Sequence, residues 1–173
     1  MTKSTLLAAL AAGLLASAAM PAQAQYFNRI ASFPVADNAP EAEATSSEII
    51  SASEDGMTLV YSDSPGGGIG FVDITDPAAP AAAGYVTVDG EPTSVVVIGD
   101  YAFAGVNTSE SFVAPSGHVA VIDMASKEIV ATCDVSGQPD SVAKSPDGTL
   151  LAVAIENERD EDLNDGEIPQ LPA

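Results

Sequence analysis

The sequence has few basic residues, a single cysteine and a single histidine, and each scarcity excludes a class of function. Five Lys and Arg residues stand against 25 Asp and Glu residues, which gives a net charge of −20. Such a surface repels nucleic acid and anionic lipid. Cys133 has no second cysteine to pair with, and one His with one Cys is too few for an ordinary zinc site. We expect most of the carboxylates to form a solvated acidic surface without a specific ligand.

The lone cysteine and the lone histidine both fall in stretches that we expect to be strands. Cys133 belongs to the alternating run from Glu128 to Val135, which predicts a buried or half-buried position rather than a reactive thiol. His118 begins an apolar run, and no Ser-His-Asp arrangement can be drawn for it with the residues around it. We therefore expect a structural or surface role for His118.

The first 24 residues have the pattern of a secretory signal peptide. A lone Lys3 precedes an apolar stretch from Leu6 to Ala16, and the small-x-small sequence Ala22-Gln23-Ala24 follows it as a cleavage site. The alternative is a membrane anchor, but this stretch is short for a hydrocarbon core about 30 Å thick. The sequence thus predicts an exported protein in the periplasm, the medium or at the cell surface, with no membrane insertion after cleavage.

A repeated pattern indicates the fold. Asp55-Gly56 and Asp147-Gly148 each separate two short apolar runs, and they lie 92 residues apart, or two periods of 46. The intermediate copy has Gly99-Asp100 at the turn. A period in the forties with four short strands per unit is typical of a β-propeller blade. No helical periodicity is found outside the signal peptide, so we expect an all-β fold of four-stranded antiparallel blades.

The repeat divides the chain into an N-terminal strand and linker at 25–47 and an incomplete β-propeller at 48–173. The blades are expected at 48–89, at 92–135 and, in part, at 139–173. The strands are expected at 48–53, 58–62, 69–75 and 85–89, then at 94–98, 101–106, 118–124 and 129–135, and finally at 141–145 and 150–156. These make about two and a half blades.

The blade number predicts that the chain is the N-terminal part of a longer protein. A propeller typically needs 4 to 8 blades to close its ring. The missing C-terminal blades are therefore the first expected partners of this chain. Residues 29–35 are expected to form an outer strand that pairs with the last blade.

The loops of this fold are expected to gather carboxylates on one face. The loop that enters the first strand of a blade and the loop that leaves its second strand lie on the same side. Crowded carboxylates repel one another unless protons or a cation neutralise them, and Ca²⁺ takes 6 to 8 oxygen ligands. The expected cluster consists of Glu48, Asp63, Glu91, Glu110, Asp140, Glu156 and Glu158.

The acidic run at 156–167 is the strongest local signal for a cation. It holds oxygen ligands at alternate positions, but Asp165 stands where an EF-hand has its turn Gly and Leu171 where it has its bidentate Glu. A solvated acidic loop is the alternative. Arg159 is either a salt-bridge organiser or a clamp for a phosphate oxygen. The calcium candidates are Glu91, Asp140, Glu156, Glu158, Asp160, Asp162 and Asn164.

Several segments resemble known repeat families. Residues 117–156 resemble the YVTN-type repeats of seven-bladed propellers, and residues 70–80 resemble an LVIVD-type repeat. Segments 48–50, 58–65, 107–112 and 156–161 are similar to the N-terminal propeller of exported bacterial proteins of the esterase-like phytase or alkaline phosphatase family. This resemblance implies hydrolysis of a phosphomonoester, with a phosphorylated small molecule as substrate and calcium on an acidic channel face. It assigns no catalytic residue in this chain.

Two functions from different classes remain. In the first, the chain is the N-terminal part of a secreted, calcium-dependent phosphatase or phytase-like hydrolase, and is inactive by itself. In the second, it is a non-catalytic binding or scaffold module of an exported or cell-surface protein. Neither involves nucleic acid.

Overall fold

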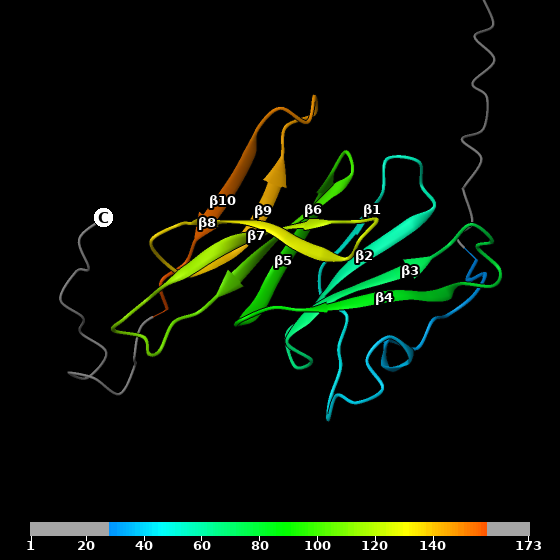
Figure 1. Cartoon of the computed structure of the whole chain (residues 1–173), viewed down its shortest axis with the longest axis horizontal. Coiled ribbons are helices and arrows are strands. Elements are labelled where there is room, and N and C mark those ends of the chain that lie inside the picture. Colours follow the sequence, from blue (N-terminus) through cyan, green and yellow to red (C-terminus); the bar gives the residue numbers. More distant parts are fainter. Residues whose placement is uncertain (1–27, 159–173) are drawn as a thin grey trace, which may run out of the picture.

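The computed structural model describes residues 28–158, which form three antiparallel sheets in chain order (Figure 1). The first sheet contains β1 (Ile50–Ala52), β2 (Thr58–Asp63), β3 (Gly68–Asp73) and β4 (Ala81–Thr87). The second contains β5 (Glu91–Ile98), β6 (Tyr101–Asn107), β7 (Gly117–Asp123) and β8 (Glu128–Asp134). The third contains β9 (Pro139–Lys144) and β10 (Leu151–Ile155). We call these sheets blades 1, 2 and 3.

This architecture confirms the predicted all-β fold with four-stranded antiparallel blades. Within each sheet, every strand pairs with the next one along the chain, as in a meander. The largest difference is β4, which starts at Ala81 rather than at Tyr85. Its first residues are small and carry no β-branched side chain, so local propensity does not mark them, but Ala81 and Ala82 pair with Asp73 and Val72.

The repeated Asp-Gly turn has the same hydrogen bonds in blades 1 and 3. In blade 1 the Ser53 hydroxyl donates to Asp55 Oδ1 at 2.6 Å and accepts from Thr58 N–H at 2.9 Å. In blade 3 the Ser145 hydroxyl donates to Asp147 Oδ1 at 2.6 Å and accepts from Leu150 N–H at 3.0 Å. The glycine of each turn has positive φ, 71° and 68°, a conformation that Gly adopts without steric cost.

The hydrophobic core lies between blades 1 and 2. Its largest members are Ile69, Phe71 and Ile122, all fully buried, and they pack with smaller side chains of β2, β5 and β6. The small residues Ala102, Ala104 and Ala120 of blade 2 face this core. Small side chains of blade 2 therefore leave room for large ones such as Phe71 of blade 1, and the two sheets can approach closely.

Serine side chains join the first strands of successive blades. Ser51 on β1 accepts a hydrogen bond from the Val97 N–H on β5 at 3.1 Å. Ser94 on β5 accepts one from the Val142 N–H on β9 at 3.2 Å. A serine of each earlier blade thus accepts from a backbone donor on the blade that follows it.

Residues 28–49 contain no strand; one turn of 3₁₀ helix, η1 (Val35–Asp37), interrupts an extended path. A strand requires a hydrogen-bonded neighbour, and none of the described blades pairs with residues 29–35. The predicted outer strand therefore does not form on these blades, and its pairing with a last blade stays a prediction. The signal peptide lies outside the described residues. Within residues 28–158, no helix has the length and apolarity to cross a membrane.

Cys133 is exposed, which corrects the prediction of a buried or half-buried position. It lies on β8, the outermost strand of blade 2, whose seven residues are all exposed. An outermost strand has a neighbour on one side alone and no sheet against its faces here. Alternation of apolar and polar residues therefore does not guarantee burial in an edge strand.

Candidate functional site

A polar cavity of about 290 Å³ lies at one end of blade 2, beside the connection from β4 to β5 and the loop from β6 to β7. His118 on β7, Thr132 and Asp134 on β8, and Asp89 in the β4–β5 connection line it. The loop between β6 and β7 closes the cavity, because the Thr108 N–H donates to the Ser116 carbonyl at 3.0 Å. We call it the His118 cavity.

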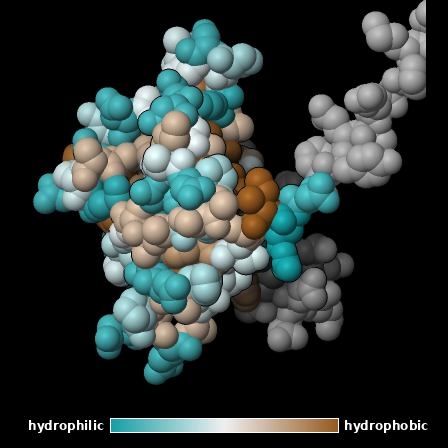
Figure 2. All heavy atoms as spheres, turned by 90° about the vertical axis from the view of Figure 1, so that its right-hand side faces the viewer, coloured by the Kyte–Doolittle hydropathy of each residue, from teal (hydrophilic) through white to brown (hydrophobic). Residues whose placement is uncertain are grey.

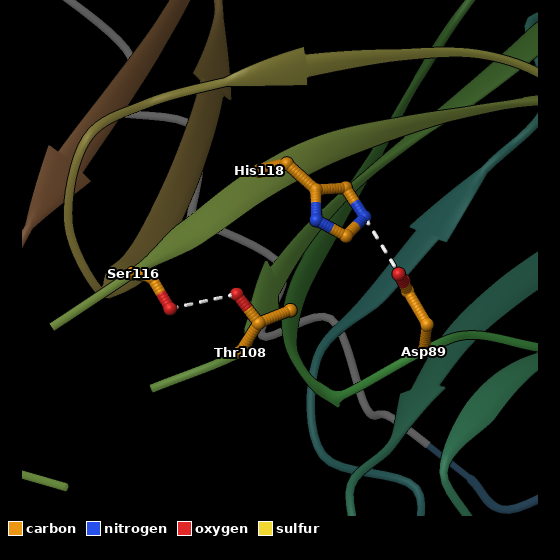
Figure 3. A network of polar contacts seen from close by, with 4 residues as sticks. All are labelled: Asp89, Thr108, Ser116 and His118. Carbon is orange, nitrogen blue, oxygen red and sulfur yellow. Dashed lines mark hydrogen bonds and ion pairs between the residues drawn. The ribbon is translucent and has the colours of Figure 1, made fainter. Parts of the chain in front are cut away.

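The His118 ring points toward Asp89, whereas the Thr108 and Ser116 hydroxyls meet 3.0 Å apart on the other side (Figure 3). His118 Nε2 lies 3.3 Å from Asp89 Oδ1, close enough for an ion pair when the ring is protonated. The alignment is too poor for a hydrogen bond, so Nε2 is buried without a hydrogen-bond partner among residues 28–158. The hydroxyl and carboxylate oxygens that line the cavity can accept hydrogen bonds from a ligand.

The His118 cavity lacks the geometry of nucleophilic catalysis. Such a site needs a hydroxyl within hydrogen-bond reach of the base. In the described part of the chain, the hydroxyls of Thr108, Ser109 and Ser116 bond to one another or to the backbone rather than to His118. The prediction of a structural or surface role for His118 is consistent with this arrangement.

Asp63 was expected on the open acidic face, but it is fully buried at the end of β2. Its Oδ1 accepts from the N–H groups of Ser46 and Gly66 at 2.8 and 2.9 Å, and its Oδ2 accepts from the Tyr85 hydroxyl at 3.2 Å. Burial, and then the Asp63 charge, raise the pKa of Tyr85 above its usual range. Asp63 therefore ties the linker and the β2–β3 turn to blade 1 and offers no oxygen to a ligand.

The other carboxylates of the expected face are exposed and spread over three blades. Glu91 begins β5, Asp140 lies on β9, and Glu156 and Glu158 follow β10. Glu48 accepts a hydrogen bond from the Ser64 hydroxyl at 2.7 Å. Among residues 28–158, no group of three His, Cys, Asp or Glu side chains lies close enough to hold a metal ion.

Hydrogen bonds join two of the loops that were expected to carry the cation site. The Glu156 N–H donates to the Gln138 carbonyl at 3.0 Å, and the Gln138 N–H donates to Asn157 Oδ1 at 3.1 Å. The loop before β9 and the start of the acidic run therefore lie side by side, as expected. Arg159, Asp160, Asp162 and Asn164 lie outside the described residues, so the calcium and phosphate candidates among them stay predictions.

One contact of the N-terminal segment was not foreseen from the sequence. Strand β4 has a bulge opposite β3, which leaves Phe71 without a partner on β4. Asn38 Nδ2 donates to the free Phe71 carbonyl at 2.8 Å and to the Tyr61 hydroxyl at 3.1 Å. A bulge shows in the sequence only through Gly84, whose φ is +119°.

The fold of one solved structure is similar to that of this chain. The hydrazine synthase of Kuenenia stuttgartiensis is similar over 64% of this chain, with a TM-score of 0.54 and 20% identity. The Cps50 (Swd1) β-propeller domain of Myceliophteria thermophila matches 62% of the chain with a TM-score of 0.35 and 13% identity. This chain spans 30% and 48% of those two chains, respectively.

No curated protein matches the sequence. The model of the choice-of-anchor I domain matches residues 48–170, which include all ten strands and begin where blade 1 was predicted to begin. That match carries no assignment as a phosphatase or a phytase. The chain belongs to the choice-of-anchor I domain family.

Proposed function

We propose that this chain is a non-catalytic β-propeller module that binds or supports other parts of an exported protein at the cell surface. The observation that carries this proposal is how the described polar groups are used. Asp63 is saturated by three hydrogen bonds inside blade 1, and the only His faces an Asp rather than a hydroxyl. The family description refers to a choice of anchor, which fits an exported protein held at the surface.

The open edge of blade 3 supports a role within a larger assembly. β10 pairs with β9 on one side, and no described strand pairs with its other side. Unpaired N–H and C=O groups of an edge strand are a template for further strands. We propose that further strands of blade 3 pair with this edge and that C-terminal blades of the parent protein complete the ring.

The finer hypothesis is a calcium-dependent phosphatase or phytase-like hydrolase. The contacts of Gln138 with Glu156 and Asn157 favour it, because they bring two of the expected acidic loops together. In this hypothesis calcium held by Asp140, Glu156, Glu158 and the following acidic residues would neutralise a phosphate and lower the pKa of an attacking water. Arg159 would hold a phosphate oxygen.

One experiment separates the two functions. The chain and the full-length parent are assayed with p-nitrophenyl phosphate, with and without a calcium chelator, and after Glu156→Ala, Glu158→Ala and Arg159→Ala are combined. We expect no hydrolysis above buffer by the chain, and no effect of the chelator or of the three substitutions on the parent. If the parent hydrolyses the substrate, and both the chelator and the substitutions abolish this activity, the phosphatase hypothesis is correct and the non-catalytic module is wrong.

A further inference from the structure

The His118 cavity has complete walls within residues 28–158. Its lining residues belong to blade 2 and the β6–β7 loop, apart from Asp89 in the β4–β5 connection. The side of the molecule that carries β3 and β4 differs, because hydrophobic atoms lie at its surface beside hydrophilic ones (Figure 2). In a closed ring a further blade would cover that side. No further blade is needed to form the His118 cavity, so its lining shows what kind of ligand fits.

Three side chains of the cavity lie on one face of blade 2. His118 on β7 pairs with Asp134 on β8, and Ala120 pairs with Thr132 two residues along. Since alternate residues of a strand share a face, His118, Thr132 and Asp134 line the cavity from the same side of the sheet. Residues directly opposite each other in an antiparallel pair have Cβ atoms about 4.5–5.5 Å apart. One small group can therefore contact His118 and Asp134 together.

Asp89 determines which nitrogen of the His118 ring faces the cavity. The His118 side chain is 13% exposed, and its Nε2 is buried 3.3 Å from Asp89 Oδ1. The Asp89 side chain is 79% exposed, so it has room to rotate into line with an N–H at Nε2. Nδ1 lies on the ring edge away from Asp89, toward the Thr108 and Ser116 hydroxyls (Figure 3). A neutral ring with its proton on Nε2 presents Nδ1 to the cavity as an acceptor.

The charges around the cavity select a cation. Asp89 and Asp134 are acidic, and no lysine or arginine of residues 28–158 lines the cavity. The Ser136 N–H donates to Asp134 Oδ1 at 2.8 Å, which leaves Oδ2 for another donor. A net charge of −20 attracts a positive ligand and repels an anion. A primary ammonium has three N–H donors, which match the Asp134 carboxylate and His118 Nδ1.

The two hydroxyls of the β6–β7 loop suit a neutral polar group of the ligand. The Thr108 and Ser116 hydroxyls lie 3.0 Å apart, so one of their protons joins them and the other is left for a ligand oxygen. A ligand hydroxyl can accept that proton and donate its own. The volume of about 290 Å³ lies just below the range of about 300–1,000 Å³ that is usual for drug-sized ligands, which favours a compact molecule.

We propose that the His118 cavity binds a small primary amine that carries hydroxyl groups, a compound of the amino sugar class. The ammonium lies between His118 Nδ1 and the Asp134 carboxylate, and hydroxyls of the ligand bond to Thr108 and Ser116. Asp89 is a positioning residue that orients the ring. This inference rests on the proposed function, because the cavity binds its ligand without reacting with it.

The test is calorimetric titration of the 173-residue chain at pH 7 with glucosamine, N-acetylglucosamine, ethylamine and glucuronate. We expect glucosamine to bind about tenfold more tightly than N-acetylglucosamine, in which a neutral amide replaces the ammonium. Ethylamine has the ammonium but no hydroxyl and should also bind more weakly than glucosamine. Glucuronate should not bind, because it is an anion. Salt should weaken the binding of glucosamine.

The location of the ligand can be followed by NMR. His118 is the only histidine of the chain, so its ring signals report on this cavity alone. The chemical shifts of the two ring nitrogens distinguish the tautomers, and we expect the proton on Nε2 in the free chain. Glucosamine should shift the Nδ1 signal more than the Nε2 signal. Ring signals that stay unchanged when the chain is saturated would mean that glucosamine binds elsewhere and that the proposal is wrong.

Two matched variants test the contact with the ammonium. Asp134→Asn removes a charge but keeps an oxygen for the Ser136 N–H, so glucosamine should bind about tenfold more weakly and N-acetylglucosamine as before. Asp140→Asn removes a charge from an exposed position on β9 that does not line the cavity, and should change neither affinity. Equal binding of the two sugars by the native chain, or equal effects of the two substitutions, would overturn the proposal.

Other occupants give distinct results. If Ca²⁺ shifts the His118 signals and glucosamine does not, the cavity is a site for an inorganic cation and the proposal is wrong. Ethylamine that binds as tightly as glucosamine would contradict the role of the ligand hydroxyls. Hydrolysis of p-nitrophenyl phosphate by the parent, by contrast, would refute the proposed function without changing these titrations.

Discussion

At the scale of single residues, position in the blade decides what a carboxylate does. Asp63 and Glu91 are both acidic and both lie at strand ends on the expected face, yet one is fully buried and the other exposed. The difference comes from Ser46 and Tyr85, which approach Asp63 from distant parts of the chain. Such long-range partners leave no mark in the local sequence, so the burial of Asp63 could not be predicted from it.

Replacing Asp63 by Ala should destabilise the fold strongly. The substitution leaves the half-buried N–H groups of Ser46 and Gly66 and the Tyr85 hydroxyl without this acceptor, which we expect to cost about 3 kcal/mol of unfolding free energy. Urea unfolding followed by circular dichroism measures it. Glu128→Ala on the exposed strand β8 is the control and should stay within about 0.5 kcal/mol. An equal effect of both changes would show that Asp63 does not hold the linker.

Asp147 should make stability depend on pH. The Ser145 hydroxyl, then the Thr149 hydroxyl and N–H, hold the pKa of Asp147 below its ordinary value of 3.8. Since the folded-state pKa is the lower one, the stabilisation is complete above the unfolded pKa and is lost as the pH falls through the folded value. Asp147→Asn should therefore destabilise at pH 7, and in urea unfolding this effect should shrink as the pH is lowered below 3.8. Asp140→Asn is the control, and a pH-independent difference for Asp147→Asn would contradict the assignment.

Cys133 should react as an exposed thiol. Because every residue of β8 is exposed, a water-soluble thiol reagent should modify Cys133 in the native protein as completely as in urea. Mass spectrometry counts the added group. Protection of the thiol in the native chain would mean that another strand covers β8 in solution.

At the scale of the elements, the turns were the most predictable part of the fold. The Ser-x-Asp-Gly sequence determines its own hydrogen bonds within five residues, so blades 1 and 3 fold this corner alike. The start of β4 and its bulge depend on pairing with β3; Gly84 is a local sign of the bulge, but nothing between Ala81 and Gly84 marks the start of the strand. Strand ends were therefore predicted well where a turn defines them and poorly where pairing does.

Replacement by alanine should destabilise the fold by different amounts at Gly56 and Gly70. At Gly56 the added Cβ meets nothing within 4 Å, and Gly56→Ala should cost only the positive φ, about 1 kcal/mol. At Gly70 the Cβ would overlap the buried Tyr61 ring, so Gly70→Ala should cost about 3 kcal/mol or more. The melting temperatures of the two variants measure this difference in stability. The reverse order would mean that Tyr61 has room to move.

At the scale of the whole molecule, the blade order was predictable and the packing of the N-terminal segment was not. The 46-residue period follows from the sequence alone, because every blade repeats the same short strands and turns. The N-terminal segment instead lies against blade 1 through Asn38, whose bond to the Phe71 carbonyl joins positions 33 residues apart. Residues 29–35 were expected to pair as a strand, since an alternating run predicts extension but does not select a partner.

The open edge should show in hydrogen exchange. Amides of β10 that do not bond to β9 face solvent, and the strand has no fully buried residue, whereas β6 lies between two strands with four buried residues. We expect β10 to exchange by local opening faster than β6 by at least about tenfold. Mass spectrometry of peptic peptides measures both. Equal protection would show that β10 is already covered in solution.

The serine hydrogen bonds between blades run in one direction along the chain, from the earlier blade to the later one. Ser51 of blade 1 completes the backbone hydrogen bonding of blade 2, and Ser94 of blade 2 does the same for blade 3. A ribosome releases the N-terminal blade first, so each finished blade is a ready template on which the next one nucleates. Assembly is thus expected to proceed as growth from one end, with the earliest blade setting the register of those that follow.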